Sequence, residues 1–336
     1  MPNEAPMTSG PTWGLWLEPL LPALELAGLA RDAEAAGASH VFVADEGTER
    51  DLFVVLSILA QATSRVLLGA GVTNPFTRHP VTLAAGFATL AELAPGRIVA
   101  GFGTGGTRTL APMGLDPARP YTSLVQCLDV VEELLAGKEV AFEGDFAVRD
   151  AKLSWSPGRL PIATAGRGPK VERLGATRAD WILLSGKAID QVAPACDRIR
   201  EAGAAVGNDP RIAWSSYIGW DEAMLDEVRP HFTYIATDMP VELRRAAGID
   251  DRTAGQIQSI MLKEGMDAAS RLVPDHVVRR YAVVAGRDAT VARLARVREL
   301  ARPDMFLLPV NDYSRAAEFV SSAPQILFDA GFQRST

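Results

Sequence analysis

Short apolar runs alternate with longer amphipathic segments along most of this chain. The runs are rich in β-branched and aromatic residues and show no polar side, which is typical of parallel strands covered on both faces. The pattern predicts strands over residues 13–17, 40–44, 66–72, 98–102, 161–165, 181–184 and 212–220. Apolar residues at helical spacing predict helices over residues 20–36, 52–63, 80–93, 123–136, 169–179 and 189–204. Segments 277–285, 289–300, 305–310 and 315–329 supply the last strands and helices.

Two stretches fall outside this alternation. Residues 140–155 predict a hairpin after the fourth helix, and residues 221–274 predict a helical insertion after the seventh strand. Eight βα units with right-handed crossovers argue for an α/β fold of the (β/α)8 TIM barrel type, with its active site at the C-terminal ends of the strands. A doubly wound open sheet is the alternative. We expect residues 1–12 to form a flexible N-terminal tail and residues 13–336 to form a single barrel domain.

Composition and charge narrow the class of partner. The chain of 336 residues is 48% hydrophobic, enough for a large core, and its formal net charge is -7 without any dense block of Lys or Arg. These values argue against a nucleic-acid surface and favour a small-molecule substrate. The N-terminal residues lack the order of a signal peptide and no run has membrane-spanning length, so we expect a cytoplasmic protein without a membrane partner.

Cysteine and histidine usage argues against a disulfide framework and against a metal site. Cys127 and Cys196 are far apart and each lies in a helical pattern, so both are expected to be buried thiols. The four histidines show no pairing at helical spacing, and no His-Glu-x-x-His sequence occurs. We therefore predict that no metal is bound.

The strand predicted at 66–72 runs into a glycine-rich turn that we take as the centre of the chemistry. Gly69 and Gly71 allow a close approach to the backbone, Asn74 begins a turn, and Pro80 suits a first helical turn. A flat ligand would fit directly on this backbone. The alternative is an ordinary strand-to-helix connection with solvated side chains.

Two further glycine clusters follow predicted strands. Residues 101–106 satisfy G-x-G-x-x-G, but they follow the fourth strand and lead into 110–114, which does not read as a regular helix, so a glycine-lined floor of the barrel mouth is favoured over a Rossmann site. Gly166, Arg167 and Gly168 precede a helix that begins at Pro169, which indicates an anion site at a helix N-terminus, together with Ser185. Two tight turns with solvated cations remain the alternative.

Candidate acids, bases and substrate contacts also lie at predicted strand ends. Convergence on one face of a barrel favours a catalytic role for such residues over isolated structural roles. No Ser/His/Asp or Cys/His spacing supports covalent catalysis. The candidates are Glu18, Asp45, Glu46, His79, Trp16, Tyr217 and Trp220.

Read together, residues 71–80, 88–97, 101–105 and 166–170 resemble the luciferase-like monooxygenase superfamily. The branch that they resemble most is methylenetetrahydromethanopterin reductase, which uses the deazaflavin coenzyme F420. The likeness extends over nearly the whole chain from Gly14. It implies a (β/α)8 barrel, the cofactor F420, and a homodimer or larger homo-oligomer.

The resemblance also implies roles for the glycine clusters. Residues matching Gly71 and Val72 form a non-prolyl cis peptide that supports the deazaflavin ring, and the turn matching Thr73 and Asn74 flanks it. The segment matching 166–168 binds the phosphate of the cofactor side chain, with Ser185 beside it. Gly103, Thr104 and Gly105 belong to the same cofactor-binding set.

The chain departs from the reductase branch at positions that face the substrate. Asp45 matches a family acid, but Glu46 stands where a histidine usually follows it, Trp16 replaces a glutamate, and Gly106 replaces an acid. The resemblance therefore implies the same cofactor with a different hydride partner, and Glu46 or Glu18 as the residue that handles the proton. The substrate pocket is expected to involve the aromatic candidates and His79, under a lid formed by the insertion.

These observations predict an F420-dependent oxidoreductase that transfers a hydride between C5 of the deazaflavin and a small organic substrate. One alternative is an FMN-dependent luciferase-like monooxygenase. Another is a catalytically degenerate cofactor-binding protein, motivated by the acids missing at Trp16 and Gly106.

Overall fold

The computed structural model describes residues 10–335. Most of the tail predicted at 1–12 lies outside this range. Inside it, the Pro11 carbonyl accepts a hydrogen bond of 2.8 Å from the Gln333 backbone, and the first strand begins at Thr12. The first strand therefore begins one residue before the predicted domain boundary, next to the C-terminal segment.

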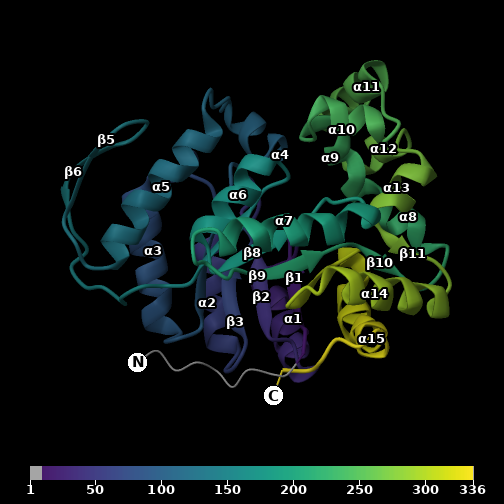
Figure 1. Cartoon of the computed structure of the whole chain (residues 1–336), viewed down its shortest axis with the longest axis horizontal. Coiled ribbons are helices and arrows are strands. Elements are labelled where there is room, and N and C mark those ends of the chain that lie inside the picture. The colour runs from purple at the N-terminus through teal and green to yellow at the C-terminus, as the bar shows by residue number, and fades with distance from the viewer. Residues whose placement is uncertain (1–9, 336) are drawn as a thin grey trace.

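Eight parallel strands close into a barrel in the order β1-β12-β9-β8-β7-β4-β3-β2 (Figure 1). The (β/α)8 prediction is confirmed, and the open sheet is excluded because β1 pairs with both β2 and β12. The strands are β1 (Thr12–Leu17), β2 (His40–Val43), β3 (Leu67–Ala70), β4 (Ile98–Phe102), β7 (Ile162–Ala165), β8 (Trp181–Leu184), β9 (Arg211–Ser215) and β12 (Met305–Pro309). The covering helices are α1 (Ala23–Ala35), α2 (Leu52–Ala62), α3 (Pro80–Leu93), α5 (Pro120–Leu135), α6 (Pro169–Arg178), α7 (Val192–Ala204), α14 (Arg287–Ala301) and α15 (Ala316–Asp329).

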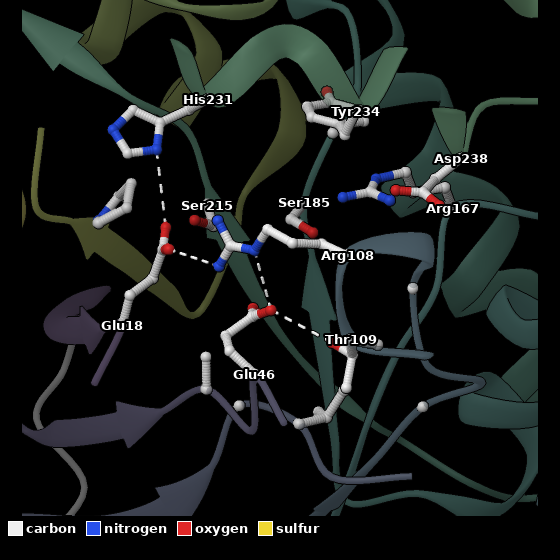
Figure 2. A pocket seen from close by; sticks show the side chains of 18 of the residues that line it. Glu18, Glu46, Arg108, Thr109, Arg167, Ser185, Ser215, His231, Tyr234 and Asp238 are labelled. Carbon is white, nitrogen blue, oxygen red and sulfur yellow. Dashed lines mark hydrogen bonds and ion pairs between the residues drawn. The ribbon is translucent and has the colours of Figure 1, made fainter. Parts of the chain in front are cut away.

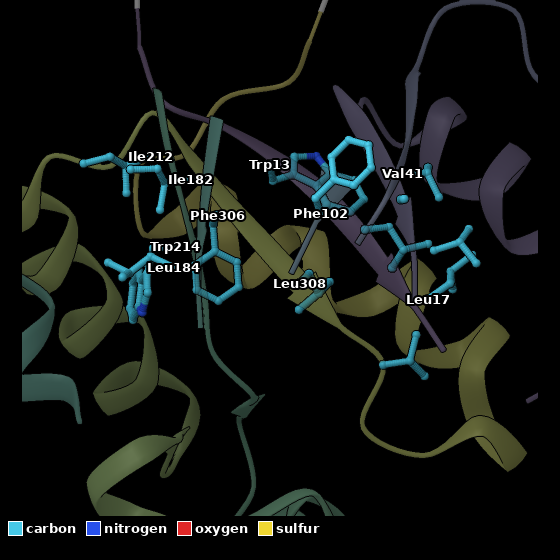
Figure 3. Packing of buried hydrophobic residues seen from close by; sticks show 14 of the residues in the cluster. Trp13, Leu17, Val41, Phe102, Ile182, Leu184, Ile212, Trp214, Phe306 and Leu308 are labelled. Atoms are coloured by element: carbon cyan, nitrogen blue, oxygen red, sulfur yellow. The ribbon is translucent and has the colours of Figure 1, made fainter. Parts of the chain in front are cut away.

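Each strand is apolar on both faces because it serves two separate cores. Along β12, Phe306 and Leu308 belong to the layer between strands and helices, whereas Met305 and Leu307 belong to the cluster inside the barrel. Figure 3 shows part of the outer layer, including Phe306 and Trp214. Their rings pack edge to face with centroids 5.0 Å apart. This double burial explains the continuous apolar runs from which the strands are predicted.

Both predicted insertions are present. The hairpin consists of β5 (Val140–Glu143) and β6 (Ala147–Ala151), and Figure 1 shows it beyond α5 at one side of the barrel. At the other side lies the helical insertion after β9. It contains α8 (Met224–Val228), α9 (Tyr234–Thr237), α10 (Val241–Ala246), α11 (Asp251–Glu264) and α12 (Met266–Ser270), and α13 (Asp275–Tyr281) follows.

Two local predictions are wrong. The strand predicted at 277–285 is mostly α13, because Pro274 and Asp275 favour a helix start and the apolar side chains of that helix all face inward. Only β11 (Val283–Val284) remains, and it pairs with β10 (Ile218–Gly219) outside the barrel. The segment after Gly106, predicted as irregular, forms the short helix α4 (Thr107–Leu110) and a 3-10 turn.

Within residues 10–335, no helix is long and apolar enough to cross a membrane. The same residues hold no group of three or more His, Cys, Asp or Glu side chains placed to share a metal ion. Cys127 and Cys196 are buried free thiols, as expected. Burial raises the pKa of each thiol to about 12, so neither is poised as a nucleophile.

Candidate active site

A cavity of about 540 Å³ opens at the C-terminal ends of the barrel strands, under the helical insertion. The strand-end turns reach one cavity because parallel strands in a barrel all point their C-terminal ends to the same face. Of the residues predicted for the site, those lining the cavity are Trp16, Glu18, Asp45, Glu46, Gly71, Val72, Asn74, Gly103, Thr104, Gly105, Gly166, Arg167, Gly168, Ser185 and Tyr217.

Three predicted site residues do not line the cavity. Thr73 is fully buried behind it and donates a hydrogen bond of 2.6 Å to Asp45. His79 caps the N-terminus of α3, where its Nδ1 accepts from the Val81 backbone. Trp220 stacks on Phe319 of α15 with ring centroids 5.7 Å apart. In each case a local structural partner holds the side chain away from the ligand space.

The turn after β3 forms one wall of the cavity. The Gly71–Val72 peptide bond is cis, as the resemblance implies. The Asn74 side chain accepts hydrogen bonds from the backbone of Phe76 and Thr77, which fixes the turn. Opposite this turn, a Cβ at Gly103 would lie 2.7 Å from a Val72 methyl group, so the floor of the cavity depends on the missing side chain.

The Asp45 carboxylate is already paired with side chains of the neighbouring turn. Its carboxylate forms an ion pair with Arg78, in addition to the bond from Thr73. Arg78 also pairs with Asp51, the residue that caps α2. These contacts tie the turns after β2 and β3 together, so a positioning role is better supported for Asp45 than the predicted catalytic role.

The loop after β7 lies at one end of the cavity and packs against the insertion. Arg167 lies over the Tyr234 ring at 3.9 Å from its centroid, and Tyr234 comes from α9 of the insertion. Both Arg167 Nε and the Tyr234 hydroxyl are buried and lack a hydrogen-bond partner within the described part of the chain. Lys187 donates to the Arg167 carbonyl at 3.0 Å and pairs with buried Glu172, which holds the loop in place.

The other end of the cavity holds a cluster of charged groups, shown in Figure 2. Arg108 donates to Glu18 at 2.6 Å and to Glu46 at 3.1 Å. His231 Nδ1 lies 3.6 Å from Glu18, and its Nε2 donates to the Asn311 carbonyl at 2.7 Å. The sequence places the two carboxylates here, whereas Arg108 and His231 are found only in the structure.

The missed residues come from segments without a strand-end signal. Arg108 lies on α4, whose first turn is capped by Asp238 of the insertion through a hydrogen bond of 2.9 Å to the Thr107 backbone. His231 and Tyr234 also come from the insertion. The glycines that precede α4 are the single sequence signal that points to Arg108.

The surroundings of the two carboxylates in this cluster shift their pKa values in opposite directions. Burial raises the pKa of Glu18, but the contact with His231 and the charge of Arg108 outweigh it and lower that pKa to about 2. For Glu46, burial and the charge of Glu18 outweigh the bonds from Arg108 and Thr109, so its pKa lies above the usual value. Of the two carboxylates, Glu18 therefore favours its charged form more strongly, and Glu46 is the more readily protonated.

Replacing Glu18 by glutamine is expected to remove one acid-sensitive part of the stability. A carboxyl whose pKa is lower in the folded state stabilises the fold above its unfolded pKa of 4.5, and this contribution is lost as the pH falls toward 2. It amounts to about 3 kcal/mol at most. Urea unfolding from about pH 5 to about pH 3 measures it, since the wild type should lose stability faster than E18Q. Parallel curves for the two proteins would contradict the lowered pKa of Glu18.

A closed (β/α)8 barrel whose strand ends surround one cavity, with paired carboxylates at one end and buried unpartnered donors of the described residues at the other, has the architecture of a barrel enzyme. The chain belongs to the luciferase-like monooxygenase family, whose model matches residues 7–302.

Curated relatives are reductases and dehydrogenases. The chain is 24% identical to the 5,10-methylenetetrahydromethanopterin reductase of Archaeoglobus fulgidus over 84% of its length and 88% of that protein. It is 31% identical to the enzyme of the same name from Methanolobus tindarius, over 60% of this chain and 62% of that one. An F420-dependent glucose-6-phosphate dehydrogenase from Nakamurella multipartita is 34% identical over 53% of this chain and 59% of its own length.

Solved structures confirm the fold. The coenzyme F420 dependent tetrahydromethanopterin reductase from Methanopyrus kandleri superposes with a TM-score of 0.78 at 24% identity, over 95% of this chain and 100% of that chain. An F420-dependent secondary alcohol dehydrogenase, solved with an F420-acetone adduct, gives a TM-score of 0.76 at 19% identity, over 96% of this chain and 99% of that chain.

Proposed function

We propose that this chain is an F420-dependent oxidoreductase that exchanges a hydride with a small organic substrate. Relatives and structural neighbours named as F420-dependent enzymes support the cofactor. The observation that carries the proposal is the cavity itself, which has the unpartnered donors of Arg167 and Tyr234 at one end and the half-buried Glu46, whose pKa is raised, at the other.

The residues present fit a cofactor with a phosphate-bearing chain and a planar ring. The unpartnered Arg167 Nε and Tyr234 hydroxyl are donors that an anion would satisfy. Gly71 and Gly103 line the cavity and pack closely against Phe42 and Val72, which an added Cβ would prevent, so bare backbone is available to a flat ring on this wall and floor. The residues that would hold the cofactor are Gly71, Val72, Thr73, Asn74, Gly103, Thr104, Gly105, Gly166, Arg167, Gly168 and Ser185, with Thr73 acting from behind the wall.

The protein's own contribution is to position the reactants and to manage a proton. When bound, F420 supplies the site that accepts or donates a hydride, which carries two electrons and one hydrogen. Oxidation of an alcohol to a ketone also releases the hydroxyl proton, and reduction of the ketone consumes one. We assign this proton to the Glu46 carboxylate, whose raised pKa suits the exchange, while Glu18 stays charged and holds Arg108.

Separate titrations of the purified protein with F420 and FMN test the cofactor. We expect F420 to bind and FMN to bind at least tenfold more weakly. Tight binding of FMN without binding of F420 would favour the monooxygenase alternative. Binding of F420 without turnover of a broad panel of alcohols, ketones and enones would favour the degenerate cofactor-binding protein.

Replacing Arg167 by leucine is expected to weaken F420 binding by about 10- to 100-fold, because one charge-assisted contact to the phosphate is lost. R173L is the matched control, since Arg173 is an exposed residue of the adjacent helix α6. Fluorescence titration of both variants with F420 measures the effect. Equal affinities for the two variants would show that the loop after β7 does not hold the phosphate.

We also propose the homodimer or larger assembly that the family resemblance implies. Sedimentation velocity of the full chain measures it directly, and a monomer at all concentrations would remove this part of the proposal.

A further inference from the structure

We infer that the substrate of this cavity is uncharged at the end that faces Glu46, and that the site rejects carboxylated and phosphorylated molecules. The inferred substrate class is a ring-containing molecule with a hydroxyl or carbonyl group as its reacting oxygen. The inference rests on the proposed function only in assigning this end of the cavity to the substrate.

The barrel topology separates the substrate end from the loop after β7. Glu18 and Glu46 follow the neighbouring strands β1 and β2, whereas Gly166–Gly168 follow β7. In the closed order β1-β12-β9-β8-β7-β4-β3-β2, β7 lies opposite β1. Figure 2 shows the same separation, with Glu18 at one side of the cavity and Arg167 at the other. A negative charge at the substrate end therefore receives no help from the loop after β7.

Among the described residues, the guanidinium at this end of the cavity already has its charge paired with two carboxylates. Among the described residues that line the cavity, Arg108 and Arg167 are the only Lys or Arg side chains. Arg108 uses Nη2 for Glu18, Nε for Glu46 and Nη1 for the sulfur of Met266 at 3.3 Å. One N–H remains on each Nη, but an incoming carboxylate or phosphate that accepts from them lies beside both carboxylates, which repel its charge.

The net charge of the cluster and the other side chains that line this end of the cavity also favour an uncharged substrate. Two carboxylates face one guanidinium and the His231 imidazole, so even with His231 counted as a cation the cluster offers no net positive charge to an anion. Trp16, Tyr313 and Met266 supply aromatic and apolar surface beside it, which suits a ring. Glu46 Oε2 also accepts from Thr109 at 3.2 Å, and Glu46 is then the group that meets the reacting oxygen.

Benzamide and benzoate test the inference, because they have nearly the same shape and only benzoate is charged. Binding of each is measured by calorimetry on the full-length protein saturated with F420. We expect the wild type to bind benzamide at least tenfold more tightly than benzoate. Benzoate binding as tight as benzamide, or binding of neither molecule, would overturn the inference.

The double variant E18Q/E46Q tests the role of Arg108 directly. Without its two anionic partners, Arg108 is free to hold a carboxylate, so benzoate should gain at least tenfold in affinity relative to benzamide. E242Q/E264Q is the matched control, because it removes two exposed carboxylates of the insertion and should leave the ratio unchanged. An unchanged ratio in the double variant would overturn the inference. If the double variant does not fold, E46Q removes one of the two partners and should shift the ratio in the same direction by a smaller factor, and an unchanged ratio there overturns the inference.

Failure of this inference and failure of the proposed function are distinguishable. F420 binding is measured separately, and its absence would remove the proposed function. The benzamide and benzoate measurements are then repeated on cofactor-free R167L protein, in which the second lining cation is gone. Selectivity for benzamide in that protein supports the inference whatever the cofactor, and loss of the selectivity contradicts it.

Discussion

Replacement of Glu46 by glutamine is expected to lower kcat by about 10²- to 10⁴-fold while F420 still binds, since a positioned acid or base contributes a factor of this size. Glutamine keeps the shape of the side chain and still accepts a bond from Arg108, but it cannot exchange a proton. The rate is measured by stopped-flow absorbance of the deazaflavin, with a substrate that the wild-type protein converts. Fluorescence titration gives the affinity for F420.

E49Q is the matched control for this prediction. Glu49 lies three residues further along the same loop, is exposed and does not line the cavity. A plot of the wild-type kcat against pH should also show a titration step with its midpoint above pH 4.5, because the pKa of Glu46 is raised. This step should be missing in E46Q. A kcat for E46Q within threefold of the wild type would show that another group handles the proton.

Replacement of Gly101 by alanine is expected to destabilise the barrel by about 3 kcal/mol or more, because the added atom has no space. A Cβ at this position would lie 1.8 Å from the Ala70 carbonyl oxygen and 3.2 Å from a Val72 methyl group. The first contact is with backbone of the neighbouring strand β3, which cannot move aside as a flexible side chain does. Urea unfolding measures the change through the midpoint of the transition.

G28A is the control for the Gly101 variant. Gly28 lies within α1, and the nearest atom to an added Cβ is the far end of Arg31 at 3.9 Å. Alanine there should leave the protein unchanged or stabilise it by up to about 1 kcal/mol, because it favours the helix. A G101A protein that unfolds at the same urea concentration as the wild type would show that the contact between β3 and β4 yields easily.

The sequence by itself determined the barrel and much of its mouth. Double burial makes each parallel strand a continuous apolar run, and this signal needs no partner to be visible. Since all strand ends of a barrel lie on one face, residues such as Glu18, Glu46 and Gly103 were placed together by their position after a strand. The family resemblance correctly predicted the cis Gly71–Val72 bond.

Only the tertiary structure decided which side chains reach the cavity and what charge they carry there. His79 follows a strand as Glu46 does, but its ring accepts a hydrogen bond from the Val81 backbone at the N-terminus of α3 and does not line the cavity. Arg108 and His231 lie in segments with no strand-end signal, and docking of the insertion brings them to Glu18. The pKa of each carboxylate depends on those same neighbours and on burial. The contacts of Arg108 and His231 with these carboxylates join segments more than sixty residues apart, and no local pattern in the sequence records them.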